Sequence, residues 1–155
     1  MASSSHVHDH ADVHEHTHEH AQVTPSAGRS TRQREAICGV IESAGRPLLP
    51  QEVLDTARLQ VPGLGLATVY RNLKTLQEDG RIESVVLPGQ AARFQATEHQ
   101  HHHHFHCERC DRVFPIHACP GPMDHLVPAG FALRRHDLTL HGLCADCVSA
   151  QGAAA

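Results

Sequence analysis

The segment His99–Cys110, which reads HQHHHHFHCERC, constrains the fold of this 155-residue chain more than any other feature. Six of its twelve residues are histidines, and they adjoin a Cys-x2-Cys pair. A second pair with the same spacing lies near the end of the chain. Two such pairs are typical of a closed tetrahedral zinc site with four thiolate ligands. We therefore expect a structural Zn2+ bound by Cys107, Cys110, Cys144 and Cys147.

The run of four histidines within this segment carries a geometric prediction. The aromatic and β-branched residues that flank it favour a strand over 101–107, which then turns at the Cys-x2-Cys pair. Side chains on a strand alternate between its two faces. His101 and His103 should point to one face, and His102 and His104 to the other. The run can then supply two ligands to each of two metal sites. The alternative is an exposed polar strand or a tag-like run, but a tag is expected at a terminus and not beside a Cys-x2-Cys pair.

The six cysteines also allow a disulfide framework as an alternative to metal binding. The first residues lack the apolar core of a signal peptide, and no apolar run approaches the roughly 18 residues of a membrane span. We therefore expect a cytoplasmic protein without membrane association, in which the paired cysteines are reduced thiolates on metal. Cys38 and Cys119 lie outside the pairs, and the apolar helical face around Cys38 predicts its burial.

Residues 1–28 differ in composition from the rest of the chain. They hold seven histidines and four acidic residues but no lysine or arginine, so they account for the net charge of -4. Such a segment cannot bury a core and is predicted to be disordered. His14, Glu15 and His18 match the HExxH metalloprotease pattern, but no helical apolar pattern surrounds them, and we reject that interpretation. A loose metal-binding arm and an inert tail both remain open.

Helical apolar spacing begins after this segment. Ser30 and Thr31 can cap a helix through Ala44, and Pro50 can open a second helix. An apolar stripe predicts a third helix over 66–79, and two short strands, 82–87 and 91–96, flank a Pro-Gly-Gln turn. Three short helices followed by a two-stranded wing describe a winged helix-turn-helix, whose third helix enters the major groove of DNA. We expect this domain over residues 29–97 and a separate metal-binding domain over 98–150.

Two stretches of the chain resemble the ferric uptake regulator family of metal-dependent repressors. The first is ATVYRNL at residues 67–73, and the second is the histidine run before Cys107. Further matching motifs extend the resemblance over residues 30–148, and FALRRHDLTLHGLCADCV is most similar to the zinc uptake regulator branch. The resemblance implies an α+β fold with a winged helix and a small α+β dimerisation domain. Such a homodimer binds operator palindromes when its sensing site holds metal.

The resemblance also implies roles for individual residues. The expected cofactors are the structural Zn2+ and a second, regulatory ion, for which we choose Zn2+. Ligands of the sensing site are matched by Glu83, His102 and His104. Ligands of a further site, found in many members, are matched by His101, His103 and His136. The candidate contacts to double-stranded DNA are Thr68, Tyr70, Arg71, Lys74 and Arg32.

The chain departs from the family pattern at several ligand positions. Gln95 lies where iron-sensing members have glutamate, and no cysteine follows the wing as it does in zinc-sensing members. Pro47 replaces a histidine of iron-sensing members, and a further-site glutamate would fall near Pro122. The fourth ligand of either histidine site is therefore open, with Asp124, His125, His117 and His99 as candidates. We expect His106 and His141 at the surface or beside the ligands.

These observations favour a repressor of metal uptake genes that senses zinc. A repressor of the same family that senses iron, manganese or nickel is the first alternative. A zinc hydrolase or deaminase needs three protein ligands, an open coordination position and a nearby acid or base, whereas the four-cysteine set is closed. We therefore do not expect an enzyme. A metal storage protein or metallochaperone would leave residues 30–98 without a role.

Overall fold

The computed structural model describes residues 27–152. The expectations for the histidine-rich segment 1–28 therefore fall almost wholly on residues outside this range. The elements of the described part follow one another in this order: α1 Ala27–Ala44, α2 Pro50–Ala57, α3 Leu66–Glu78, β1 Ile82–Val85, β2 Arg93–Ala96, β3 His103–Cys107, β4 Val113–Ile116, the 3-10 turn η1 Asp124–Leu126, β5 Thr139–Gly142 and α4 Ala145–Gly152.

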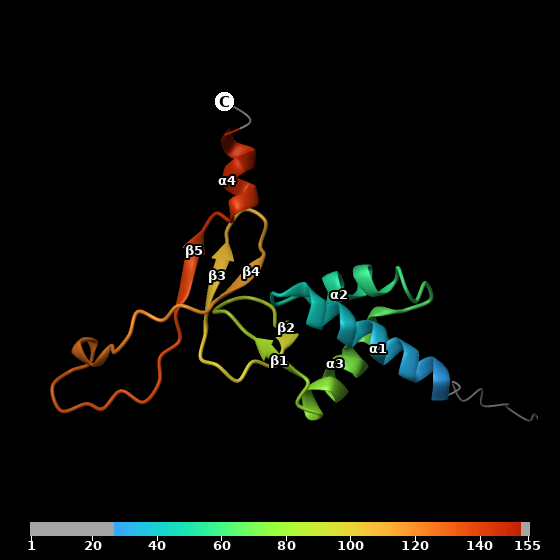
Figure 1. The fold of residues 1–155 in the computed structure, drawn as a ribbon, viewed down its shortest axis with the longest axis horizontal. Coiled ribbons are helices and arrows are strands. Elements are labelled where there is room, and N and C mark those ends of the chain that lie inside the picture. Colours follow the sequence, from blue (N-terminus) through green and yellow to red (C-terminus); the bar gives the residue numbers. More distant parts are fainter. Residues whose placement is uncertain (1–26, 153–155) are drawn as a thin grey trace, which may run out of the picture.

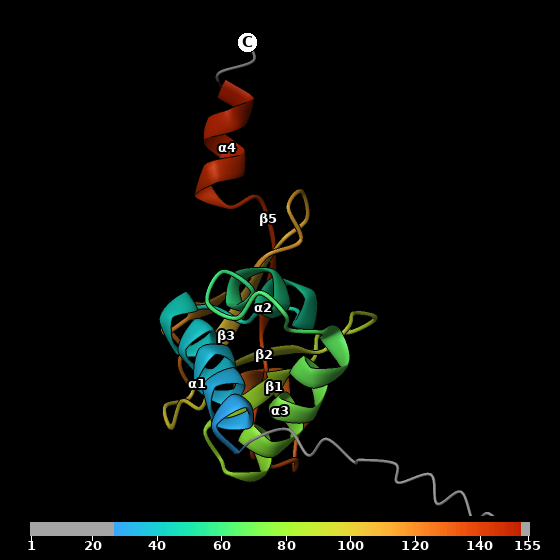
Figure 2. The same ribbon diagram turned by 90° about the vertical axis from the view of Figure 1, so that its right-hand side faces the viewer.

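Helices α1, α2 and α3 pack together, as Figures 1 and 2 show. Their apolar side chains form a common buried core. Helix α1 begins at Ala27, earlier than the predicted start at Ser30, because Ala27 and Arg29 are good helix formers and continue the helix across Gly28. Helix α2 begins at Pro50, as predicted, and the backbone N–H of Leu49 donates to Glu52 at 2.8 Å. The shared core is formed by Ile37, Val40, Ile41, Val53, Leu54, Ala57, Val69, Leu73 and Leu76.

The predicted wing is present as the antiparallel pair of β1 and β2. Ile82 pairs with Ala96 and Val85 with Arg93. Both strands are shorter than the predicted ranges 82–87 and 91–96. The turn between them contains Pro88, which lacks a backbone donor, and Gly89 at a φ of 74°, so the ladder cannot continue to the turn itself. Buried Phe94 ties the wing to the helices, because Leu48 exchanges two backbone hydrogen bonds with it.

A second sheet has the strand order β4-β3-β5 and carries the histidine run. Strand β3 is antiparallel to β4 and parallel to β5. It begins at His103, later than the predicted start at residue 101. Between β4 and β5 the chain leaves the sheet in a long excursion over residues 117–138, drawn in orange in Figure 1, whose one short element is η1. Helix α4 then extends from the opposite end of this sheet (Figures 1 and 2).

The wing touches the second sheet through a small buried cluster of Val85, Leu87 and Val113. Val113 lies opposite His106 near the end of β3, and residues of β1 line a pocket together with His102, His103 and His104, so β1 also lies close to the start of β3. Among the helices within residues 27–152, none has the length and apolar content that a membrane span requires.

Candidate metal centres and DNA-binding face

The four paired cysteines converge on one point at the end of the second sheet. Their Sγ atoms all lie within 4.8 Å of one another, and those of Cys110 and Cys144 are 3.7 Å apart. Tetrahedral zinc with Zn–S bonds of about 2.3 Å separates its sulfur ligands by about 3.8 Å. Cys107 closes β3, Cys147 lies in the first turn of α4, and three of the four side chains are buried. The set therefore has the spacing and the enclosure of a structural metal site.

The four thiols differ in how readily they ionise. Burial opposes ionisation of Cys107, but backbone N–H donors from Cys110, Cys144 and Arg109 outweigh it and lower its pKa to about 6. Burial, followed by the hydrogen bonds that its thiol donates to the neighbouring sulfurs, raises the pKa of Cys147 to about 12. Four thiolates this close repel one another, and a divalent ion that all four ligate removes the conflict.

A second cluster joins three histidines to a cysteine. The Nε2 atoms of His101 and His103 are 3.2 Å apart, and those of His101 and His136 are 3.3 Å apart. The Sγ atom of Cys119 lies 3.3 Å from Nε2 of His136, and all four ligand atoms lie within 4.8 Å of one another. We refer to these residues as the Cys119 cluster. The strand alternation predicts that His101 and His103 share a face, and the structure brings them together.

Cys119 is the member of this cluster that sequence reasoning missed. It lies on the segment after β4, at a position that matches no family motif, and it is exposed, unlike the other unpaired cysteine, Cys38. A cysteine outside both Cys-x2-Cys pairs is the sequence signal by which this ligand could have been identified. The predicted candidates for a fourth ligand are not in the cluster that the structure assembles: Asp124, His125, His117 and His99.

His102 and His104 face the wing from the other side of the histidine run, with their ring centroids 5.0 Å apart. The Gln95 side chain, buried on β2, joins them to the wing: its Nε2 donates to Glu83 Oε1 at 2.7 Å and contacts His102 Nε2 at 2.9 Å. The ring nitrogen Nδ1 of His102 lies 3.1 Å from the carbonyl oxygen of Gln100, which leaves Nε2 to accept from the Gln95 amide. We refer to Glu83, Gln95, His102 and His104 as the Glu83 site.

His104 carries an unsatisfied atom in the Glu83 site. Its Nε2 is buried and has no hydrogen-bond partner. Burial is the largest cause that lowers the pKa of His104, and the neighbouring His102 lowers it further, which favours the neutral ring. A neutral imidazole with an orphaned nitrogen is a competent metal ligand. The residues present therefore fit a divalent ion, although Gln95 supplies an amide where a thiolate or carboxylate could have stood. His117 and Glu98 lie nearby, with His117 Nδ1 3.8 Å from a Glu98 carboxylate oxygen.

Polar side chains gather where α1 meets α3. Thr68, Tyr70 and Arg71 lie on α3, and Tyr70 is 53% exposed although it adjoins the apolar stripe. Arg71 donates to the Thr68 hydroxyl at 3.0 Å, which positions its guanidinium at the surface. Lys74 lies one turn further, with its side chain 79% exposed. The face is hollowed by a shallow pocket lined by Ser30, Gln33, Arg34, Thr68, Arg71, Asn72 and Thr75.

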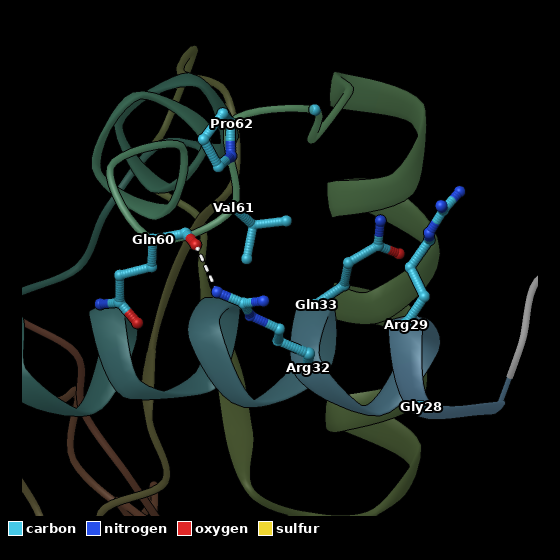
Figure 3. Close-up of a pocket in the computed structure, with 8 residues that line it drawn as sticks. Gly28, Arg29, Arg32, Gln33, Gln60, Val61 and Pro62 are labelled. Atoms are coloured by element: carbon cyan, nitrogen blue, oxygen red, sulfur yellow. Dashed lines mark hydrogen bonds between the residues drawn. The ribbon is translucent and has the colours of Figure 1, made fainter.

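Arg32 lies beside this face rather than on α3. Figure 3 shows its guanidinium directed at the loop after α2, where it donates to the Gln60 carbonyl at 3.3 Å. A pocket opens there between the start of α1 and this loop, and Arg29 borders it. Two arginines and the α3 residues therefore present positive charge on adjoining surfaces.

Residues 26–141 match the sequence model of the ferric uptake regulator family. The chain belongs to the ferric uptake regulator family. The ferric uptake regulation protein of Staphylococcus aureus is 35% identical over 97 residues, which cover 63% of this chain and 69% of that protein. The peroxide operon regulator of Bacillus subtilis is 27% identical over 139 residues, which cover 87% and 94%. A solved zinc uptake regulator in complex with zinc and DNA has a TM-score of 0.51 and 26% identity, covering 77% and 83%.

Membership of the ferric uptake regulator family confirms the predicted α+β fold with DNA-binding and dimerisation parts. It also makes the chain a metal-responsive repressor of a family whose members bind DNA as dimers. The similar proteins are named for iron, peroxide and zinc responses, so the family does not decide which metal this chain senses.

In this member of the family, a buried polar network joins the wing to the four-cysteine site. Arg93 on β2 is 1% exposed and donates to both the carbonyl and the carboxylate of Asp111, each at 2.8 Å. Asp111 follows Cys110 at a φ of 59° and also contacts His106 Nε2 at 2.7 Å. His106 is therefore buried in the network, and only His141, 3.4 Å from it, is exposed as expected. The ion pair between Arg93 and Asp111 therefore links the wing directly to the metal-binding turn.

Replacing Asp111 by asparagine should destabilise the protein by roughly 1–3 kcal/mol, because the charge-assisted bond to a buried guanidinium is lost. Asparagine tolerates the left-handed backbone, so strain is not added. Glu78→Gln is the matched control, since its ion pair with Lys74 is exposed and contributes about 0–1 kcal/mol. Urea denaturation of both variants measures the difference. An Asp111→Asn variant as stable as Glu78→Gln would mean that the ion pair adds nothing.

Proposed function

We propose that this chain is a zinc-responsive repressor of metal uptake genes, with a structural Zn2+ at the four cysteines and a regulatory ion at the Glu83 site. The observation that carries the proposal is the composition of the Glu83 site. Glu83 belongs to the wing, whereas His102 and His104 belong to the second sheet and the segment before it. An ion bound by both would bias the orientation of one part relative to the other.

Gln95 supports the regulatory role of the Glu83 site. Without metal, its amide N–H groups lie between an acidic oxygen and an imidazole nitrogen, which both accept. A divalent ion would take over these two acceptors and also satisfy the orphaned nitrogen of His104. Metal binding would then replace the neutral amide donor of Gln95 with a charged ion between the wing and the second sheet. Such coupling between a metal site and a DNA-binding element typically amounts to about 1–3 kcal/mol.

DNA recognition in this proposal falls to α3 and the surfaces beside it. Thr68, Tyr70 and Arg71 would reach base edges and phosphates, while Lys74 and Arg32 would contact the backbone. Arg71 is preordered by Thr68, so it loses little side-chain freedom on binding. A homodimer would place two such helices on the two halves of a palindromic operator.

A second candidate differs only in the ion. The Glu83 site offers carboxylate, imidazole and amide groups but no thiolate, and such a set also suits iron, manganese or nickel. Zinc is favoured by the two histidine ligands and by the similarity of the C-terminal segment to zinc uptake regulators.

Operator binding should rise in buffered Zn2+ at free concentrations far below those of Mn2+, Fe2+ or Ni2+ that give the same effect. The measurement is a band-shift titration of dimeric protein that keeps its structural zinc, with each ion buffered separately. Activation by another ion at its own physiological level, with no response to zinc, would overturn the zinc assignment and leave the repressor assignment intact. No DNA binding with any ion would argue against the repressor and favour metal storage.

A further inference from the structure

The Cys119 cluster has no part in the function proposed above, yet it is the most completely assembled histidine site in the described chain. His101, His103 and His136 match the further metal site found in many members of the family, and we propose that in this chain the Cys119 thiolate completes this site as the fourth ligand of a divalent cation of borderline-soft character, such as Zn2+ or Co2+. This inference goes beyond the repressor function and does not depend on it.

The spacing of the ligand atoms matches a tetrahedral ion. Zinc bonds of about 2.0–2.1 Å to nitrogen and 2.3 Å to sulfur place neighbouring ligands about 3.3–3.6 Å apart. The measured separations are 3.2 Å for His101 and His103, 3.3 Å for His101 and His136, and 3.3 Å for Cys119 and His136. Hydrogen bonds among neutral imidazoles and a thiol join these atoms only in pairs, whereas an ion at the centre would bind all four.

The Cys119 cluster combines a buried ligand with solvent-exposed ones. His103 is 1% exposed, so one ligand is held rigidly in the sheet, while His101 and Cys119 are open to solvent and allow an ion to enter. The thiolate distinguishes the Cys119 cluster from the Glu83 site, which holds no sulfur. Soft thiolate ligands select against manganese and magnesium, so the two sites would differ in the ions that they accept.

Because of where the cluster lies in the chain, an ion bound there would restrain the segment between β4 and β5. Cys119 follows β4, and His136 lies just before β5, so the two residues stand near the two ends of the long excursion seen in Figure 1. An ion would tie both ends to His101 and His103 and close a loop over residues 119–136. Closing a loop of this length removes conformational freedom from the segment, which exposes Leu126 and Phe131.

Ion binding requires one local rearrangement. The backbone N–H of Leu138 donates to His103 Nδ1 at 3.2 Å, which places the ring proton on Nε2. Ligation through Nε2 needs the proton on Nδ1, so this hydrogen bond must open. We therefore expect the Leu138 amide resonance to shift when the ion binds, an observation that does not depend on DNA.

Titrating Co2+ into protein that already holds zinc at the four cysteines should produce a thiolate-to-cobalt charge-transfer absorption and the visible bands of a tetrahedral ion. Cys119→Ser should lose the charge-transfer absorption and bind Co2+ at least about tenfold more weakly. Cys119→His should restore affinity without the sulfur absorption. Cys38→Ser is the matched control, because the Cys38 thiol is buried and donates to Glu42, away from the cluster. It should behave as the unmodified protein.

Alkylation provides an independent measurement. Iodoacetamide should modify Cys119 in protein without added Co2+ and should spare it after loading, as peptide mass spectrometry would show. Unchanged alkylation, or a Cys119→Ser variant with the same cobalt spectrum and affinity, would overturn the proposal. Cys119 is exposed, so the variant should fold, and circular dichroism would verify this. Operator binding by Cys119→Ser tests the repressor function separately, since a loss of cobalt absorption with retained DNA binding supports this inference alone.

Discussion

Replacing Cys107 or Cys144 by serine should remove one zinc ion per chain and unfold the part of the protein built on β3, β4, β5 and α4. Both side chains are buried, and Cys107 Sγ accepts a hydrogen bond from the Cys144 backbone N–H at 3.3 Å. Among the described residues, the apolar side chains packed against these cysteines are the partly buried Phe105, Phe114 and Leu143. So small an apolar core cannot replace a metal whose binding contributes about 10–16 kcal/mol in small zinc-folded units. Typical total stabilities are about 5–15 kcal/mol.

The measurements for this prediction are zinc content by atomic emission and oligomeric state by analytical ultracentrifugation. Cys38→Ser serves as the control again, since it removes a buried thiol that is remote from the four-cysteine site and lies within 3.3 Å of Glu42. That variant should keep its zinc and remain a dimer. A Cys107→Ser protein that retains full zinc content and the dimer would refute the structural zinc assignment.

Replacing His102 and His104 together by alanine should abolish the metal dependence of operator binding, a loss of roughly 5- to 150-fold in affinity under metal-replete conditions. The reason is geometric: these rings lie beside Gln95, which contacts the wing residue Glu83. The matched double variant, His101→Ala with His103→Ala, removes the same number of imidazoles from the opposite face of the run. It should lower metal content while changing operator affinity much less.

Fluorescence anisotropy with an operator duplex, at fixed buffered zinc, compares the two variants directly. Thermal unfolding should show that both retain the four-cysteine site and the helical core. Equal losses of affinity from the two pairs would contradict the assignment of regulation to the Glu83 site. Both faces of the histidine run would then take part in sensing.

Much of this architecture follows from local sequence patterns. The stripe of Val69, Leu73 and Leu76 predicts α3 because burial of one helical face depends on residues a few positions apart. Gly80 ends that helix at a φ of 70°, a conformation that glycine adopts without strain. Local sequence also predicts that His101 and His103 lie on one face and His102 and His104 on the other, because side chains alternate along an extended chain without any tertiary contact.

Which distant residues complete each site was decided only by the tertiary structure. Sequence spacing could not place Cys119 beside His136, because the long excursion between β4 and β5 has no regular periodicity that fixes where its ends return. Nor could it show that the Gln95 amide would stand between Glu83 and His102, since that depends on the register of β1 against β2 and on how the wing packs on the second sheet. Local residues determine strands and helices through short-range sterics and burial. The contents of a metal site depend on where separate elements meet.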